Sequence, residues 1–219
     1  MVKGVIFDMD GTMFDTERLS TKGWIYAGKK LGVDIPVALT DSFRGRNPQA
    51  IRKKFAAYFG DRLDYDTARA MKHEYFDEVT KESVPHKEGL QDLLEYLKKN
   101  HIKMAVASST RYERVLSNLK SIKVDQFFDA IIGGDQIKHG KPAPDIFLKA
   151  VELLEVNKED ALVLEDSKNG ILAAHAGNIP VICIPDLIHH SKDILDLTVG
   201  CYDSLDQLID VIVKKDDKA

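Results

Sequence analysis

The sequence predicts an α/β fold in which a parallel sheet forms the core and an α-helical domain is inserted into that core. Short strands that are apolar along their whole length alternate with amphipathic helices from residue 87 onward, as in parallel sheets covered on both faces. Residues 16–82 show helical periodicity and no strand-like run. We therefore expect a core domain from residues 1–15 and 83–219, and a helical domain from residues 16–82.

The core elements follow from the apolar pattern of each segment. Strands are expected at residues 2–7 and within residues 102–110, 128–135, 161–167 and 179–185. Helices are expected where apolar residues recur at i, i+3 and i+4, namely at residues 87–100, 115–119, 144–154, 169–177 and 205–212. This order of strands and helices indicates a Rossmann-like, doubly wound core.

Three helices are expected in the inserted segment. The first carries Trp24 and Leu31 on its apolar face, and the third spans residues 68–79. The second begins at an Asn47-Pro48 cap and ends at Gly60. We interpret the segment as a small helical bundle inserted after the first strand.

Composition excludes several classes of protein. The chain has 219 residues and a net charge of -4, which argues against nucleic acid or an anionic membrane as its partner. No apolar run reaches the length of a membrane span, and no signal peptide is expected before the first strand. The two cysteines, Cys183 and Cys201, are expected to be buried or half-buried free thiols. These features indicate a cytoplasmic protein.

Polar groups follow four of the predicted strands. In an open α/β sheet, ligands bind beyond the carboxyl ends of the strands, so these groups are expected to meet. They comprise carboxylates, hydroxyls and one lysine: Asp8, Asp10, Ser108, Ser109, Thr110, Lys141, Glu165, Asp166 and Ser167. Gathered carboxylates need a cation, and oxygen ligands suit Mg²⁺. Hydroxyls with a lysine form an anion site, and together these features predict phosphoryl transfer.

Asp8 and Asp10 form the most informative pair. In an extended backbone, residues i and i+2 point the same way, so the two carboxylates are pushed together. Crowding of this kind separates pKa values, which allows one carboxyl group to stay charged while the other carries a proton. Gly11, which follows, is expected to permit a positive φ or a close backbone approach.

The motifs resemble those of the haloacid dehalogenase (HAD) superfamily. "DMDGT", Ser108 after a strand, "KPAPD" and "LEDS" occur in that family's order, and "FDMDGTMFDTERL" is similar to the β-phosphoglucomutase-like phosphatase branch. The resemblance spans the whole chain and implies an aspartyl-phosphate mechanism. It implies that Asp8 is the nucleophile and that Asp10 is the general acid and base.

The resemblance also implies the ligands of the site. Mg²⁺ would be held by Asp8, the backbone carbonyl of Asp10 and Asp166, with Glu165 as a further ligand. The phosphate would be held by Ser108, Ser109 and Lys141.

The helical insertion resembles the cap domain that recognises the leaving group of the substrate in this family. Thr16, Arg46 and Lys72 are its expected substrate contacts. The resemblance implies a phosphoric monoester hydrolase that acts on a small phosphorylated metabolite such as a sugar or nucleoside phosphate. We also expect a monomer.

A sugar-phosphate mutase of the β-phosphoglucomutase type is the alternative. Mutases of that type carry a histidine where Ser20 stands and an arginine where Pro48 stands, and both departures favour the phosphatase. Arg46 could supply an equivalent clamp from a shifted position.

Two other classes of protein are disfavoured. Receiver domains place the acceptor aspartate on a later strand than the acidic pair and lack a large helical insertion. A catalytically silent binding module would not need every polar group that the chemistry requires.

Overall fold

The structure is a computed structural model that describes residues 1–44, 46 and 48–216. The chain divides into two compact units, which we describe separately. The first consists of Met1–Phe14 together with His86–Ala219, and the second is Asp15–Pro85.

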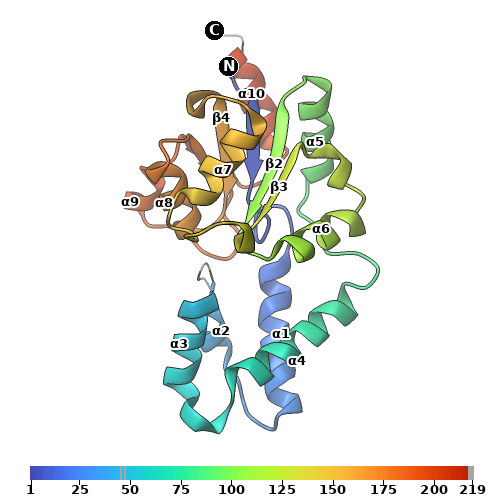
Figure 1. Ribbon diagram of the computed structural model, residues 1–219, viewed down its shortest axis with the longest axis vertical. Helices are drawn as coiled ribbons and strands as arrows, with labels where there is room; N and C mark the ends of the chain where they lie inside the picture. The colour runs from blue at the N-terminus through green and yellow to red at the C-terminus, as the bar shows by residue number, and fades with distance from the viewer. Residues whose placement is uncertain (45, 47, 217–219) are drawn as a thin grey trace. The chain divides into compact units, whose positions relative to one another are not determined.

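The first unit contains a parallel sheet, which confirms the predicted fold class. Its strands are β1 (Gly4–Phe7), β2 (Lys103–Ser108), β3 (Ala130–Gly133), β4 (Ala161–Glu165), β5 (Val181–Cys183) and β6 (Gly200–Cys201). Among the described residues the sheet has six strands in the order β3-β2-β1-β4-β5-β6 (Figure 1). Phe7 pairs with Val106 of β2 and with Leu164 of β4, so the carboxyl ends of the three central strands lie level.

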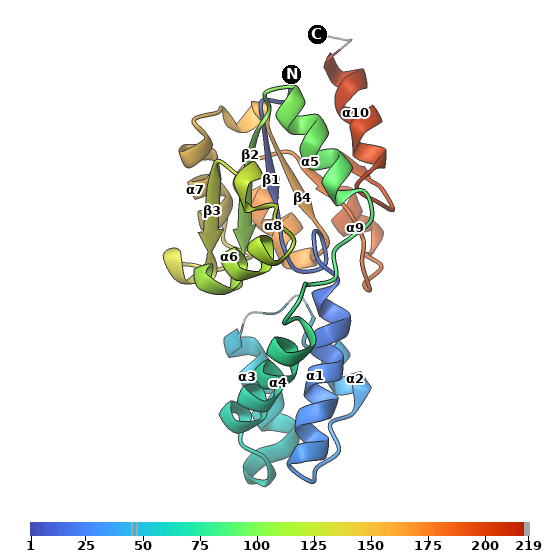
Figure 2. The ribbon, with the colours of Figure 1, turned by 90° about the vertical axis from the view of Figure 1, so that its right-hand side faces the viewer.

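Helices cover both faces of this sheet. They are α5 (Leu90–Lys99), α6 (Tyr112–Ser121), α7 (Asp145–Leu154), α8 (Lys168–Ala176), α9 (Lys192–Leu195) and α10 (Gln207–Asp216). Helices α7 and α8 lie on one face, whereas α5, α6 and α10 lie on the other (Figures 1 and 2). A buried apolar cluster joins the sheet to α7 and α8, because the strands are apolar on both faces and each face needs a cover.

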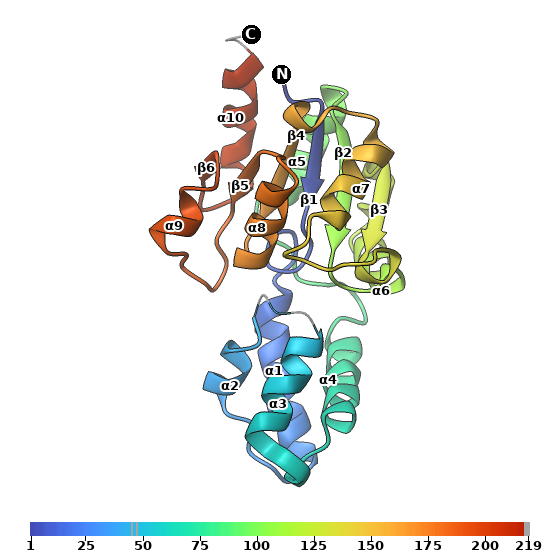
Figure 3. The ribbon, with the colours of Figure 1, turned by 60° about the vertical axis from the view of Figure 1, so that its left-hand side comes forward.

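The second unit is helical, as the periodicity predicts, but its described residues form four α-helices where three are expected. The additional helix, at Val37–Asp41, has five residues and is too short to show that periodicity. The unit contains α1 (Thr16–Lys30), α2 (Val37–Asp41), α3 (Pro48–Phe59) and α4 (Tyr65–Val79), and α1 packs along α4 (Figure 3). Helix α3 ends immediately before Gly60, whose φ of 54° is the left-handed conformation expected of a terminating glycine. The predicted cap residue Asn47 lies outside the described residues.

Aromatic side chains form the core of the second unit. The rings of Phe43, Phe55 and Tyr65 lie 5.4–6.0 Å from the ring of Trp24, and all four side chains are buried. Offset and edge-to-face pairs of this kind add to the free energy that simple burial provides. This cluster gives the inserted segment a core of its own.

The cysteine prediction is half wrong. Cys183 is buried, but Cys201 is exposed. The reason is that Cys201 lies on β6, a two-residue strand at the edge of the sheet that the sequence does not reveal. No helix among the described residues is long and apolar enough to cross a membrane.

Candidate active site

The site is built around Asp8, which directly follows β1 at the carboxyl edge of the sheet. Its backbone N–H donates to the carbonyl of Leu164 at 2.9 Å, which extends the pairing of β1 with β4 by one residue. The carboxylate is buried. An ionised carboxylate in such a place needs a compensating charge nearby.

Lys141 supplies that charge. Its Nζ donates to Oδ1 of Asp8 at 2.5 Å, to Oε1 of Glu165 at 2.8 Å and to the carbonyl of Ala107 at 3.2 Å. Burial lowers the pKa of Lys141, but Asp8 and Glu165 more than offset this and hold the pKa above its ordinary value. Lys141 is therefore a buried cation that these two carboxylates stabilise.

Both carboxylate oxygens of Glu165 accept hydrogen bonds. Its Oε1 accepts from Lys141, and its Oε2 accepts from the backbone N–H of Ser167 at 2.6 Å. A Cβ at Gly170 would lie 1.6 Å from Oε1, so only glycine leaves room for this carboxylate. Both oxygens already have donors, and this geometry favours a role for Glu165 in positioning Lys141.

Asp8, Glu165 and Asp166 form a cluster whose donor atoms fit a divalent cation. Each offers one carboxylate oxygen, these oxygens lie within 4.8 Å of one another, and all three residues are buried. Three buried carboxylates exceed the charge of one lysine, and oxygen ligands suit a hard cation. A Cβ at Gly11, where φ is 92°, would lie 2.3 Å from Oδ2 of Asp166. Gly11 thus has the positive φ and the close approach to a neighbouring group that the sequence predicts.

The pKa of Asp8 is raised well above its ordinary value. Burial is the main cause, Lys141 opposes it, and the charges of Glu165 and Asp10 add to it. A carboxylate that acts as a nucleophile must be ionised, which requires a low pKa. A divalent cation among these carboxylates would favour the ionised form, so the electrostatics also fit such a cation.

Asp10 is held by hydroxyl groups at the end of β2. Its Oδ2 accepts from Oγ1 of Thr110 at 2.8 Å and from Oγ of Ser108 at 3.3 Å. Ser108 in turn accepts from the backbone N–H of Thr110 at 3.0 Å. Ser109, which the sequence predicts as a phosphate ligand, is exposed. The two hydroxyl groups that donate to Asp10 are therefore those of Ser108 and Thr110.

The predicted substrate contacts of the helical insertion all lie in the second unit. Thr16 is the buried first residue of α1. Nζ of Lys72 lies 5.5 Å from the centroid of the Trp24 ring. Arg46 is exposed, and its Nε donates to the carbonyl of Ser42 at 2.8 Å. Their role as substrate contacts remains a prediction.

Sequence reasoning missed His190, in the segment that follows β5. Its Nε2 lies 2.6 Å from the carbonyl oxygen of Asp166, and because a carbonyl can only accept, Nε2 donates. In the same segment, Asp186 binds Nζ of Lys87 at 2.5 Å. The only sequence signal for these contacts is that the segment follows a strand of the same sheet.

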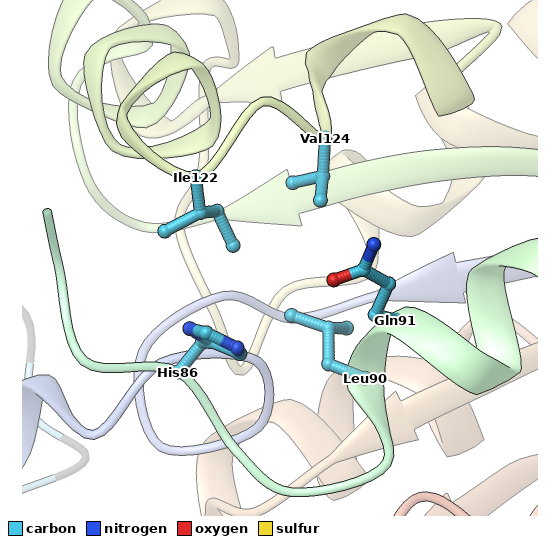
Figure 4. A pocket seen from close by; sticks show the side chains of 5 residues that line it. All are labelled: His86, Leu90, Gln91, Ile122 and Val124. Carbon is cyan, nitrogen blue, oxygen red and sulfur yellow. The ribbon is translucent and has the colours of Figure 1, made fainter.

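A pocket in the first unit lies apart from these groups. Figure 4 shows that His86, Leu90, Gln91, Ile122 and Val124 line it. None of the predicted site residues is among them. The chemistry of the sheet edge, and not this pocket, identifies the candidate site.

The chain is similar to known proteins over most of its length. Residues 5–184 match the family described as haloacid dehalogenase-like hydrolases. The chain is 34% identical to a phosphorylated carbohydrates phosphatase of Thermotoga maritima, over 81% of this chain and 82% of that protein. It is 31% identical to a fructose-1-phosphate phosphatase of Escherichia coli, over 82% and 94% of the two chains.

A solved structure gives a further comparison. The β-phosphoglucomutase of Clostridium difficile superposes with a TM-score of 0.81, at 24% identity, over all of this chain and 98% of that one. At this identity the likeness shows the fold alone.

Proposed function

The chain belongs to the haloacid dehalogenase-like hydrolases, and we propose that it is a phosphoric monoester hydrolase of small phosphorylated metabolites. The observation that carries the proposal is the buried Asp8 carboxylate, bound by Lys141 and clustered with Asp166, one residue away from a second aspartate held by hydroxyls. Two relatives, named as a phosphorylated carbohydrates phosphatase and a fructose-1-phosphate phosphatase, support a sugar phosphate as substrate. A nucleoside phosphate is the other substrate that the sequence predicts. The enzyme is proposed to act in the cytoplasm as a monomer.

Asp8 is the proposed nucleophile. Its carboxylate would attack phosphorus and form an aspartyl phosphate while the P–O bond to the leaving group breaks. Lys141 lies against Oδ1 of Asp8, so its charge would offset the charge of the transferring oxygens. Ser108, at the end of β2, would bind one of those oxygens. Ser109, which is exposed, stays a prediction as a further phosphate ligand.

Asp10 is the proposed general acid and base. It would give its proton to the leaving oxygen and then take one from the water that hydrolyses the aspartyl phosphate. The hydrogen bonds from Thr110 and Ser108 restrict its carboxyl group, which supports such a role for it. The side chain is half-buried, as a group that meets both leaving group and water must be.

Mg²⁺ is the proposed cofactor. Asp8, Asp166 and the backbone carbonyl of Asp10 would hold it, with Glu165 as a further ligand. When bound, Mg²⁺ would supply positive charge that stabilises the phosphoryl group during transfer.

A substrate screen tests the proposal. The purified protein is incubated with a panel of sugar and nucleoside phosphates, with and without Mg²⁺, and free phosphate is measured. The panel includes β-glucose 1-phosphate, with glucose 6-phosphate followed as the product of isomerisation. Metal-dependent release of phosphate without isomerisation is the expected result. Efficient isomerisation with little release would instead establish the mutase.

Asp8→Asn is the matched control for that screen, because it keeps the size of the side chain and removes the nucleophile. It should abolish turnover on every substrate. Retained turnover would overturn the mechanism. Absence of metal-dependent turnover by the wild-type protein on every compound would favour a binding module.

A further inference from the structure

Both cysteines of the chain lie on neighbouring strands in direct register. Cys183 of β5 pairs with Cys201 of β6 in the parallel sheet. Backbone hydrogen bonds hold the strands together on either side of this pair, from Val199 to Val181 at 2.8 Å and from Tyr202 to Cys183 at 3.0 Å. The two sulfurs are therefore neighbours because of the sheet and not because of a flexible loop.

The geometry of this pair suits a disulfide. Disulfides join Cα atoms that are about 4.4–6.8 Å apart, and neighbouring strands are separated by about 4.7–4.9 Å. Register partners also point their side chains to the same face of a sheet. In the structure both thiols are free.

The two thiols differ in access. Cys201 is exposed at the edge of the sheet, whereas Cys183 is fully buried within the apolar cluster beneath it. An oxidant in solution can meet Cys201 but not Cys183. Cys201 is thus placed to react with the oxidant, and Cys183 is placed to form the disulfide with the oxidised Cys201.

We propose that Cys183 and Cys201 are a thiol modification site that forms a reversible intramolecular disulfide when the protein meets hydrogen peroxide. The Cys201 thiolate attacks the peroxide, an S–O bond forms, the O–O bond breaks, and the first water leaves with the proton of that thiol. The Cys183 sulfur then attacks the Cys201 sulfur, an S–S bond forms, the S–O bond breaks, and hydroxide leaves with the Cys183 proton as a second water. The two sulfurs lose two electrons, and the peroxide accepts them.

The position of the pair connects it to the candidate site. Cys183 is also the register partner of Glu165 on β4, and Glu165 holds Lys141. The disulfide would close the segment 184–200, which contains His190. Oxidation would therefore constrain β5, which pairs with Glu165, and the segment that carries His190, which contacts Asp166.

Mass spectrometry and thiol counting test the proposal without reference to enzymatic activity. The reduced protein is treated with hydrogen peroxide, and intact mass and free thiols are measured under denaturing conditions. The expected product is a monomer about 2 Da lighter, for the two hydrogens lost, with no free thiol and full reversal by dithiothreitol. The chain has two cysteines, so the assignment is unambiguous.

Single variants give the matched controls. Cys201→Ser, at an exposed position, should leave the buried Cys183 reduced by the same treatment. Cys183→Ser, with Cys183→Ala in reserve if it folds poorly, should accumulate a sulfenic acid at Cys201 that dimedone traps.

Two results in the wild-type protein would overturn the proposal. One is a disulfide-linked dimer through Cys201, and the other is over-oxidation of Cys201 while Cys183 stays a free thiol.

Discussion

Lys141 donates a hydrogen bond to Glu165 at 2.8 Å, and Glu165 is completely buried. The same ammonium group binds Asp8, so the position of Glu165 determines where the charge of Lys141 lies relative to the proposed nucleophile. A positive charge that is already in position stabilises the transition state more in a buried site than in water, because no solvent has to reorganise during the reaction. Glu165 is therefore part of the electrostatic framework of the site.

Glu165→Gln should lower kcat by about 10–100-fold, because the amide keeps an acceptor for Lys141 but loses the charge that fixes it. Glu165→Ala should in addition destabilise the fold by about 3–5 kcal/mol, since it leaves a buried cation short of a partner. Steady-state kinetics and urea unfolding measure the two effects. Glu159→Gln, at an exposed position near the start of β4, is the control. A Glu165→Gln enzyme with wild-type kcat would contradict this role.

Thr110→Ala should lower kcat about tenfold, because Asp10 would lose the shorter of its two hydroxyl contacts and with it part of its orientation as general acid. The loss should be larger for alkyl phosphates than for p-nitrophenyl phosphate, whose leaving group needs little protonation. Kinetics on the two kinds of substrate make the comparison.

Two further variants separate orientation from a general loss of structure. Thr110→Ser keeps the hydroxyl and should restore most of the activity. Ser109→Ala, at the exposed neighbour, should change kcat by less than Thr110→Ala does. Equal loss on both kinds of substrate would argue against an effect through Asp10.

The contrast between Ser109 and Thr110 shows where prediction from sequence ends. Buried parallel strands are apolar runs of a recognisable length, so the first five strands and the edge that carries the site could be predicted. Beyond Ser108 the strand ends, and the alternation that tells which side chains share a face ends with it. Which of two adjacent hydroxyls turns toward Asp10 depends on the turn, whose conformation the residue pattern does not specify.

Two other features depend on tertiary contacts alone. Strand β6 has two residues, Gly200 and Cys201, and it exists only because its neighbours hydrogen-bond to β5. His190 lies in a segment without periodicity, so nothing in its neighbourhood along the chain indicates the contact with Asp166. Short or irregular segments of this kind take their structure from the parts that fold around them.

His190→Ala should raise the Mg²⁺ concentration needed for half-maximal activity by about 10–100-fold, because Asp166 would lose the donor that holds its backbone. At saturating Mg²⁺ the kcat should stay near the wild-type value. Calorimetric titration of the protein with Mg²⁺ alone gives a reading that does not depend on turnover. His190→Gln should recover part of the affinity through its amide N–H, and the exposed His189→Ala should have no effect. Unchanged Mg²⁺ affinity in His190→Ala would exclude the role.

Asp64 provides a pH-dependent test in the second unit, where it caps α4. Its Oδ2 accepts from the backbone N–H and from Oγ1 of Thr67, both at 2.8 Å. The backbone N–H first, and the hydroxyl next, hold the pKa of Asp64 below its ordinary value. A carboxyl group whose pKa is lower in the folded state contributes stability above its unfolded pKa of about 3.9, and this contribution is lost as the pH falls through the folded value.

Asp64→Ala should therefore destabilise the second unit at neutral pH, and its difference from wild type should shrink below about pH 4. Urea unfolding followed by the fluorescence of Trp24 measures this, because Trp24 lies 6.0 Å from the ring of Tyr65, the first residue of α4. Asp64→Asn, which keeps an acceptor but does not titrate, should show a cap contribution that does not change with pH. Asp61→Ala removes an exposed carboxylate three residues away and serves as the control. A wild-type advantage over Asp64→Ala that stays constant to pH 2 would show that ionisation of Asp64 contributes nothing to the cap.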